Sequence, residues 1–266
     1  MKIITMGTLK GGAGKTINLF NIAGILAENK KVLLVDVDPQ CNLSFDCGVD
    51  ITVRNMLTVR DIFNNTYKEQ PKAEKIILKA LIKELPNLDI IPSSILLFQT
   101  ERKIQGVSNR EHILENYIKD NIDIFEQYDY VMIDTNPSMS IINLNAFYIA
   151  DEIILSSDVS TNSINGAELF CELWDEYREE LRKEDNIAAI IISNYDKRTK
   201  LGKDLIKYTH EADFAKDLVL DAIIPATVKM KDCELKHKPV NILHPDTDIC
   251  EAFRKVVKEL KDREVL

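Results

Sequence analysis

Chemistry in this sequence centres on a glycine-rich segment with two lysines, which spans residues 10–16 and reads KGGAGKT. An apolar run at 3–6 precedes it and indicates a short buried strand, and apolar residues at helical spacing follow it from Leu19 to Ala27. In a strand–loop–helix context, glycines let successive backbone N–H groups face one anion, and the helix N-terminus adds its dipole. We therefore predict a phosphate-binding loop rather than a tight turn that binds nothing.

The side chains at the end of this loop suit a nucleotide with a divalent cation. Lys15 can reach the β- and γ-phosphate oxygens, and the Thr16 hydroxyl can ligate Mg²⁺. The residues expected to contact the nucleotide in this segment are Lys10, Gly11, Gly12, Ala13, Gly14, Lys15, Thr16 and Ile17.

Lys10 is unusual for a phosphate-binding loop. The general loop begins with glycine where this chain has Leu9, and here Lys10 directly precedes the two glycines. Two lysines supply more positive charge than one triphosphate needs from one chain, which suggests that Lys10 acts on a nucleotide held by another subunit. The arrangement resembles the deviant Walker A loop, KGGxGK[ST], of the ParA/MinD family of ATPases. That resemblance implies ATP and Mg²⁺ as cofactors.

Two carboxylates follow strand-like runs, and the carboxyl edge of a parallel sheet is where open α/β folds place ligands. The run at 31–36 leads into DVDPQCN at 36–42, in which Asp38 could orient the attacking water. The run at 130–134 ends in Asp134, which could hold Mg²⁺ together with Thr16. These segments resemble the family's switch I and Walker B motifs, and the resemblance implies Lys10, Lys15 and Asp38 as the catalytic set.

Asn194 and Pro225 are the candidates for contact with the base. Asn194 follows the apolar strand at 188–192, and its side chain offers a donor and an acceptor, which would suit either an adenine edge or a loop cap. Pro225 ends an apolar run at 222–225 that we expect to be the last strand. In the family that this chain resembles, the corresponding loop borders the base.

Strand-like and helical segments alternate along the whole chain, without an internal repeat or a Gly/Ser linker. Helical spacing also predicts helices at 72–85 and 110–126, and a final helix with an apolar face from Ile249 to Leu260. This alternation predicts an α/β fold with a mostly parallel sheet covered by helices on both faces. We expect one P-loop ATPase domain over residues 1–266.

Composition limits the class of protein. An apolar content of 45% supports a full core, 29% charged residues support a soluble surface, and no stretch is apolar for long enough to cross a membrane. Five scattered cysteines without a C-x-x-C pair favour free thiols in a reducing cytoplasm. A net charge of −9 opposes a globally basic DNA-coating protein.

Two stretches in the C-terminal part are nevertheless basic. Residues 196–208 and 228–238 each contain more Lys and Arg than Asp and Glu. They could be ordinary solvated faces or could bind nucleic-acid phosphates. The resemblance favours DNA, because related partition ATPases keep their DNA-contacting residues in this part of the chain. The candidate DNA-binding residues are Arg198, Lys200, Lys203, Lys229 and Lys231.

The resemblance covers nearly the whole chain and implies a ParA-type partition ATPase. ATP would join two subunits face to face, and the homodimer would bind DNA without sequence preference. A ParB-type centromere-binding protein would then trigger hydrolysis to ADP and phosphate. We expect a cytoplasmic protein that associates with the nucleoid when ATP is bound and that segregates plasmids or chromosomes.

Three other functions are compatible with a loop of this type. A MinD-type membrane-associated ATPase would end in a basic amphipathic helix, but residues 261–266 carry mixed charge, so we expect no stable membrane association. An iron–sulfur reductase would need cysteines near residues 135–138, which resemble the family's switch II. No cysteine lies between Cys47 and Cys171. A non-enzymatic scaffold would bind partners without turning over ATP.

Overall fold

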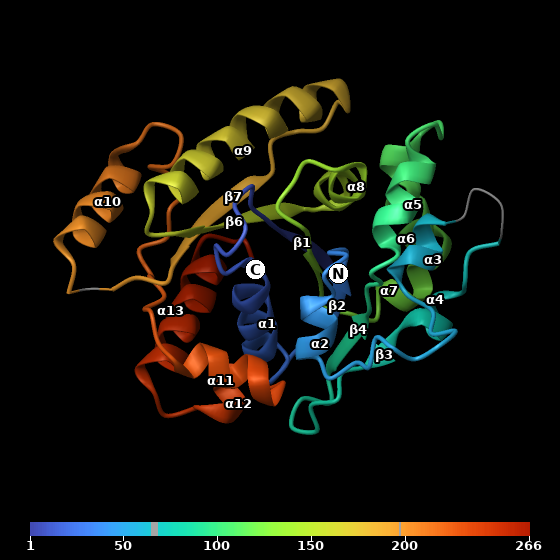
Figure 1. The fold of residues 1–266 in the computed structure, drawn as a ribbon, viewed down its shortest axis with the longest axis horizontal. Coiled ribbons are helices and arrows are strands. Elements are labelled where there is room, and N and C mark those ends of the chain that lie inside the picture. Colours follow the sequence, from blue (N-terminus) through green and yellow to red (C-terminus); the bar gives the residue numbers. More distant parts are fainter. Residues whose placement is uncertain (65–68, 197) are drawn as a thin grey trace.

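The computed structural model describes residues 1–64, 69–196 and 198–266, with only the backbone described at residue 201. Its centre is a sheet of seven strands in the order β3-β4-β2-β5-β1-β6-β7 (Figure 1). The strands are β1 (Lys2–Gly7), β2 (Val32–Asp36), β3 (Leu78–Lys79), β4 (Leu88–Ile91), β5 (Tyr130–Asp134), β6 (Glu152–Asp158) and β7 (Ile187–Ser193). Neighbouring strands pair in parallel, except that the edge strand β3 runs antiparallel to β4.

Helices connect the strands and lie over the sheet. They are α1 (Lys15–Leu26), α2 (Asn42–Asp46), α3 (Val59–Phe63), α4 (Ala73–Ile76), α5 (Leu97–Ile104), the 3₁₀ helix η1 (Arg110–His112), α6 (Ile113–Asp120), α7 (Ile122–Phe125), α8 (Ile141–Ile149), α9 (Thr161–Glu180), α10 (Lys200–Glu211), α11 (Lys229–Lys236), α12 (Val240–Leu243) and α13 (Asp248–Asp262). In the parts of the chain that the structure describes, none of them combines the length and apolar character needed to cross a membrane.

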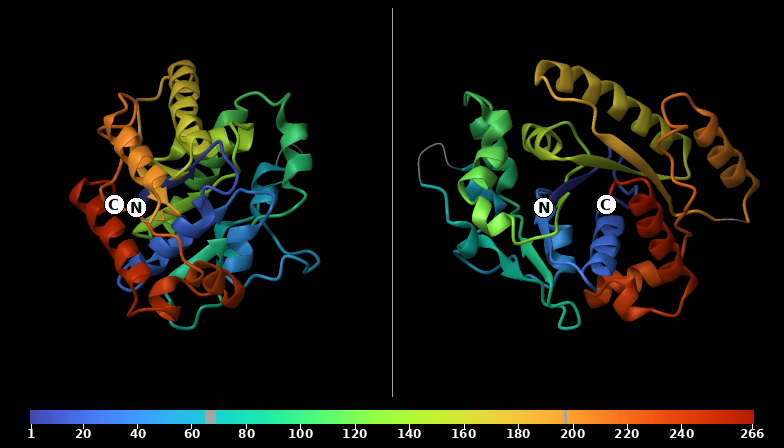
Figure 2. Two further views of the ribbon diagram at one scale, coloured as in Figure 1. Left: turned by 60° about the vertical axis from the view of Figure 1, so that its left-hand side comes forward. Right: turned by 180° about the vertical axis from the view of Figure 1, so that it is seen from behind.

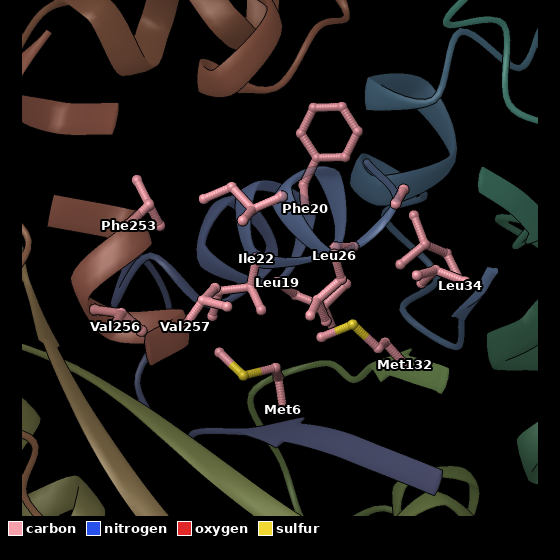
Figure 3. Packing of buried hydrophobic residues seen from close by; sticks show 14 of the residues in the cluster. Met6, Leu19, Phe20, Ile22, Leu26, Leu34, Met132, Phe253, Val256 and Val257 are labelled. Carbon is pink, nitrogen blue, oxygen red and sulfur yellow. The ribbon is translucent and has the colours of Figure 1, made fainter. Parts of the chain in front are cut away.

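Side chains of alternate strand residues enter separate cores on the two faces of the sheet. On one face, Met6 and Met132 share a core with residues of α1 and α13, such as Leu19 and Val257 (Figure 3). On the other face, α8 and α9 cover one half of the sheet, and α5 and α6 cover the other half (Figures 1 and 2). The predicted α/β fold, with a mostly parallel sheet and helices on both faces, is therefore confirmed.

Parallel register brings the carboxyl ends of the central strands to one edge. Asp134 of β5 lies level with Met6 of β1 on one side and with Asp36 of β2 on the other. The glycine loop leaves β1 at this edge and enters α1 directly. The segments that carry the predicted phosphate-binding loop and both predicted carboxylates thus meet in space.

The prediction of a helix at residues 72–85 is wrong. Only α4 is helical there, and the chain then turns into β3, where Leu78 pairs with Ile90 and Lys79 with Asp89. The edge of the sheet gives these backbone groups partners, and a salt bridge of 2.7 Å joins Lys79 to the buried Asp89. Tertiary pairing therefore overrides the helical spacing of the apolar residues.

Two other elements differ from their predictions in detail. The helix expected at 110–126 is divided into η1, α6 and α7. The run at 222–225 forms an isolated bridge between Tyr195 and Pro225 rather than a strand, although the Ile224 N–H donates to Ile192 O of β7 at 2.9 Å. The sequence also predicts a loop with a short helix over residues 52–70. The helix is present as α3, and residues 65–68 of this segment lie outside the described residues.

Close packing between α1 and the segment before α12 makes Gly24 a test of the fold. A Cβ at Gly24 would lie 2.6 Å from Pro239 Cβ. Gly24→Ala should therefore lower the free energy of unfolding by about 1–3 kcal/mol, measured by urea denaturation, because the helix must shift. Gly106→Ala is the control, since a Cβ there meets no described atom within 4 Å. Equal losses in both variants would contradict this explanation.

Candidate functional site

The glycine loop between β1 and α1 has the backbone of an anion-binding turn. Gly12 and Gly14 adopt left-handed φ values of 81° and 79°, and added Cβ atoms at Gly11 and Gly12 would face open space among the described residues. Two buried hydroxyls hold the turn on the side of the sheet. Ser156 of β6 and Ser193 of β7 donate to the Ala13 carbonyl at 2.7 and 3.1 Å. In a trans peptide the N–H lies opposite the C=O, so the Gly14 N–H is directed away from β6 and β7.

The loop borders a cavity of about 760 Å³, which is large enough for a nucleotide. The P-loop forms its floor, and α2 and α11 contribute to its wall. The lining residues are Thr8, Lys10, Gly11, Gly12, Ala13, Gly14, Lys15, Thr16, Ile17, Asp38, Gln40, Asn42, Phe45, Asp46, Pro137, Lys231, Glu234 and Leu235. The whole predicted loop segment, residues 10–17, therefore lines one cavity together with Asp38.

Asp134 joins the two side chains that follow the glycines. The ammonium of Lys15 forms a buried salt bridge with Asp134, and the Thr16 hydroxyl donates to Asp134 Oδ2 at 2.7 Å. A hydroxyl and a carboxylate are the oxygen ligands that Mg²⁺ prefers, so Thr16 and Asp134 fit a magnesium site. Lys15 is held where it could exchange the carboxylate for a phosphate.

Asp36 positions the loop that carries Asp38. Its carboxylate accepts hydrogen bonds from the Asp38 N–H at 3.1 Å and from the Ser44 N–H and hydroxyl at 2.9 and 2.6 Å. Complete burial, and secondarily the charge of Asp134, raises the pKa of Asp36 to about 7. Burial also raises the pKa of Asp38, whose carboxylate accepts from the Gln40 N–H at 2.8 Å. The first aspartate thus shapes the turn, and the second lines the cavity.

Lys10 lines the same cavity, but its ammonium is engaged within its own chain. It lies 2.8 Å from Asp158 Oδ2 and 2.7 Å from Ser160 Oγ. Asp158 is the last residue of β6, and Ser160 immediately precedes α9.

Asn194 and Pro225 do not line the P-loop cavity. Asn194 is exposed, with a left-handed φ of 56°, at the residue after β7. The neighbouring Tyr195 bridges to Pro225, and these two residues line a separate cavity of about 720 Å³ beside α13. The assignment of Asn194 and Pro225 to adenine contact stays a prediction.

The candidate DNA-binding residues fall in two places. Lys200 and Lys203 lie on α10, whereas Lys229 and Lys231 lie on α11, and the two helices are well separated in Figures 1 and 2. Lys231 lines the P-loop cavity. Arg198 pairs with Asp196, with 2.7 Å between Nη2 and Oδ2. Lys197, from the same basic stretch, lies outside the described residues. The described residues of the two stretches therefore do not form one surface.

Sequence reasoning missed the polar residues on β6 and β7. Ser156 and Ser193 support the loop, and Asp158 contacts Lys10. A signal was present, because these residues lie in the last three positions of apolar strands, and parallel strands present such ends at one edge. Which of them would face the glycine loop depends on strand order, which a single sequence does not specify.

Comparisons with known proteins agree with this geometry. The AAA domain family matches residues 1–187. An uncharacterized protein of Mycobacterium tuberculosis is 30% identical over 268 residues, covering 98% of this chain and 79% of that protein. The chromosome partitioning protein ParA of Caulobacter vibrioides is 28% identical over 266 residues, covering 99% of this chain and 95% of that protein.

Solved structures share the fold. An ATP complex of Cyanothece McdA has a TM-score of 0.85 at 21% identity, covering 98% of this chain and 96% of that chain. Cobyrinic acid a,c-diamide synthase from Mycobacterium smegmatis, with a bound ATP analogue and magnesium, has a TM-score of 0.81 at 21% identity, covering 100% of this chain and 96% of that chain.

A two-lysine glycine loop at the carboxyl edge of a mostly parallel sheet, with acidic residues beside it, defines an ATP-binding protein of the P-loop class. The chain belongs to the AAA domain family, in which it is a ParA-type partition ATPase. The resemblance drawn from its motifs is thereby confirmed.

Burial of Asp46 of α2 makes the stability of the folded chain depend on pH. Burial, followed by the charge of Glu234, raises the pKa of Asp46 to about 8, whereas the unfolded carboxyl ionises near 3.8. The folded state therefore binds more protons between these values, and stability falls as the pH rises from about 4 to about 8.

Asp46→Asn should remove this loss. Its stability advantage over the wild type should grow by on the order of 3–4 kcal/mol between pH 5 and pH 8, measured by urea denaturation without nucleotide. Asp50→Asn is the control, because Asp50 is exposed and its pKa is lowered by hydrogen bonds from Thr52. An advantage of Asp46→Asn that stays constant with pH would refute the role of burial.

Proposed function

We propose that this chain binds ATP with Mg²⁺ at its P-loop and hydrolyses the ATP to ADP and phosphate. The observation that carries the proposal is the buried contact of Lys15 and Thr16 with Asp134 directly behind the open glycine loop. The ATP in the McdA complex, and the ATP analogue with magnesium in the synthase structure, support the same ligands here.

Each residue of the site would have a separate task. Lys15 would contact the β- and γ-phosphates, together with N–H groups of residues 11–16. Thr16 and Asp134 would hold Mg²⁺, which neutralises phosphate oxygens when bound. Asp38 would orient the attacking water, since it lines the cavity and Asp36 fixes its backbone. Phosphoryl transfer depends mainly on such positioning and charge neutralisation.

Lys10 would complete the site in a second subunit. Lys15 already supplies a cation from within the chain, and Lys10 also lines the cavity. In an ATP-dependent homodimer, Lys10 would approach the nucleotide of the facing subunit and take the part of an arginine finger, an effect worth about 10³–10⁵ in rate. Catalysis by Lys10, Lys15 and Asp38 would then require dimerisation.

The ATP-bound dimer would bind DNA without sequence preference and respond to a ParB-type partner. The similarity of this chain to the Caulobacter ParA supports a role in partitioning chromosomes or plasmids. In the ATP-bound state the protein would associate with the nucleoid. Lys200 and Lys203 are the strongest DNA candidates because both are exposed at the start of α10. The Asp196 carboxylate neutralises Arg198, and Lys231 faces the P-loop cavity.

Lys15→Ala tests nucleotide binding. Without its ammonium the phosphates lose a buried cationic ligand, so affinity for ATP with Mg²⁺ should fall about 100-fold or more, by the 1.5–3 kcal/mol typical of charged hydrogen bonds plus the missing charge neutralisation. Titration calorimetry measures the change. Lys10→Ala is the control and should bind ATP normally while losing hydrolysis. Unchanged ATP affinity in Lys15→Ala would exclude the assigned role of the loop.

The double variant Lys200→Ala/Lys203→Ala tests DNA binding. With ATP, the salt dependence of binding to random duplex DNA should become shallower by about 0.9 in log–log slope for each DNA phosphate that the variant no longer neutralises. Lys255→Ala/Lys258→Ala is a control of equal charge, because these lysines pair with Glu251 and Asp262 on α13. Gel shifts over a range of salt concentrations decide the matter, and the same slope in all three proteins would place the DNA surface elsewhere.

A further inference from the structure

Lys10 has a complete set of partners in its own chain. Its ammonium lies 2.8 and 3.1 Å from the two carboxylate oxygens of Asp158 and 2.7 Å from Ser160 Oγ. The Asp158 backbone is fixed in turn, because its N–H donates to Ser163 Oγ at 3.0 Å. An ammonium has three N–H donors, and here each of them has an acceptor.

Strand register creates this arrangement. Gly7 of β1 lies level with Leu155 of the parallel strand β6. Lys10 follows Gly7 by three residues, and Asp158 follows Leu155 by three residues, so the two come to the same edge of the sheet. Thr8 holds the Lys10 backbone, since the Lys10 N–H donates to Thr8 Oγ1 at 3.1 Å. The Lys10 side chain can therefore change partners by rotation alone, while the P-loop backbone stays in place.

We propose that Asp158 and Ser160 form a latch that retains Lys10 in the free chain and must release it before Lys10 can reach a facing subunit. This inference rests on the proposed ATP-dependent dimer. The ammonium cannot satisfy Asp158 and a phosphate of another subunit with the same N–H groups. Dimerisation therefore competes with the intrachain pair, and the latch sets the ATP and protein concentrations at which the dimer forms.

The ion pair between Lys10 and Asp158 is weak enough to break when a nucleotide competes for Lys10. The side chains of Lys10 and Asp158 keep 30% and 16% of their surface exposed, so solvent screens the attraction. A nucleoside triphosphate offers more negative charge than one carboxylate, and its terminal phosphate would draw Lys10 away from Asp158. A nucleotide without that phosphate offers less, so the latch would close again after hydrolysis.

Asp158→Asn tests the latch, because it removes the charge and keeps the size of the side chain. With ATP and Mg²⁺, the protein concentration that gives half-maximal dimer in light scattering should fall about tenfold, since each dimer opens two weak ion pairs. Asp175→Asn removes the same charge from the exposed pair with Arg178 on α9 and should leave the midpoint unchanged. Both variants should unfold at the wild-type temperature.

Two further measurements separate the latch from the proposed function. Reactivity of the Lys10 amine toward an acylating reagent, read by mass spectrometry without nucleotide, should rise in Asp158→Asn and stay at the wild-type level in Asp175→Asn. In a Lys10→Ala background, Asp158→Asn should no longer shift the dimer midpoint. A wild-type protein that remains monomeric with ATP would refute the proposed dimer, whatever the reactivity of Lys10. An unchanged or raised midpoint in Asp158→Asn, beside a wild type that does dimerise, would overturn the latch alone.

Discussion

The site depends on one buried carboxylate, Asp134. Parallel register places it between β1 and β2, beside a second buried carboxylate, Asp36. Two neighbouring carboxylates without water are costly, and the Lys15 ammonium offsets part of this cost through its salt bridge to Asp134. Removing Lys15 from Asp134 without a substitute cation would leave that charge uncompensated. Phosphate binding by Lys15 should therefore be linked to occupation of Asp134 and Thr16 by Mg²⁺.

Strand β6, on the other side of β1, supplies side chains that contact the same site. Ser156 supports the P-loop through the Ala13 carbonyl, and two residues further on Asp158 holds Lys10. One strand end thus contributes both to the shape of the phosphate cradle and to the position of the second lysine. A small displacement of β6 relative to β1 would change the two together, which would link nucleotide binding to the proposed dimerisation.

Short-range sequence signals predicted the segments that meet at the P-loop. The two-lysine loop, the aspartates at 38 and 134, and the alternation of strands and helices are local patterns, and each of them is present in the fold. Features that depend on strand order could not be predicted in this way. Asp158 became a partner of Lys10 only because β6 is adjacent to β1, and Ser193 reaches Ala13 only from the next strand, β7.

Edge positions caused the main error in the fold. Residues 78–79 join β4 because the sheet has an open edge there, and this opportunity is invisible in the helical spacing of residues 72–85. The basic stretches show the same limit, because their shared location in the C-terminal part of the sequence does not bring α10 and α11 together in the fold. Charge in a sequence can be counted, but its distribution over a surface follows from packing.

Calorimetric titration of ATP, once with Mg²⁺ and once with a chelator in its place, tests whether Lys15 exchanges Asp134 for phosphate as Mg²⁺ binds. The wild type should lose at least about tenfold in ATP affinity without Mg²⁺, because Lys15 must then leave an uncompensated carboxylate. Asp134→Asn, which has no charge to compensate, should lose much less. Equal ATP affinity of the wild type with and without Mg²⁺ would contradict the account.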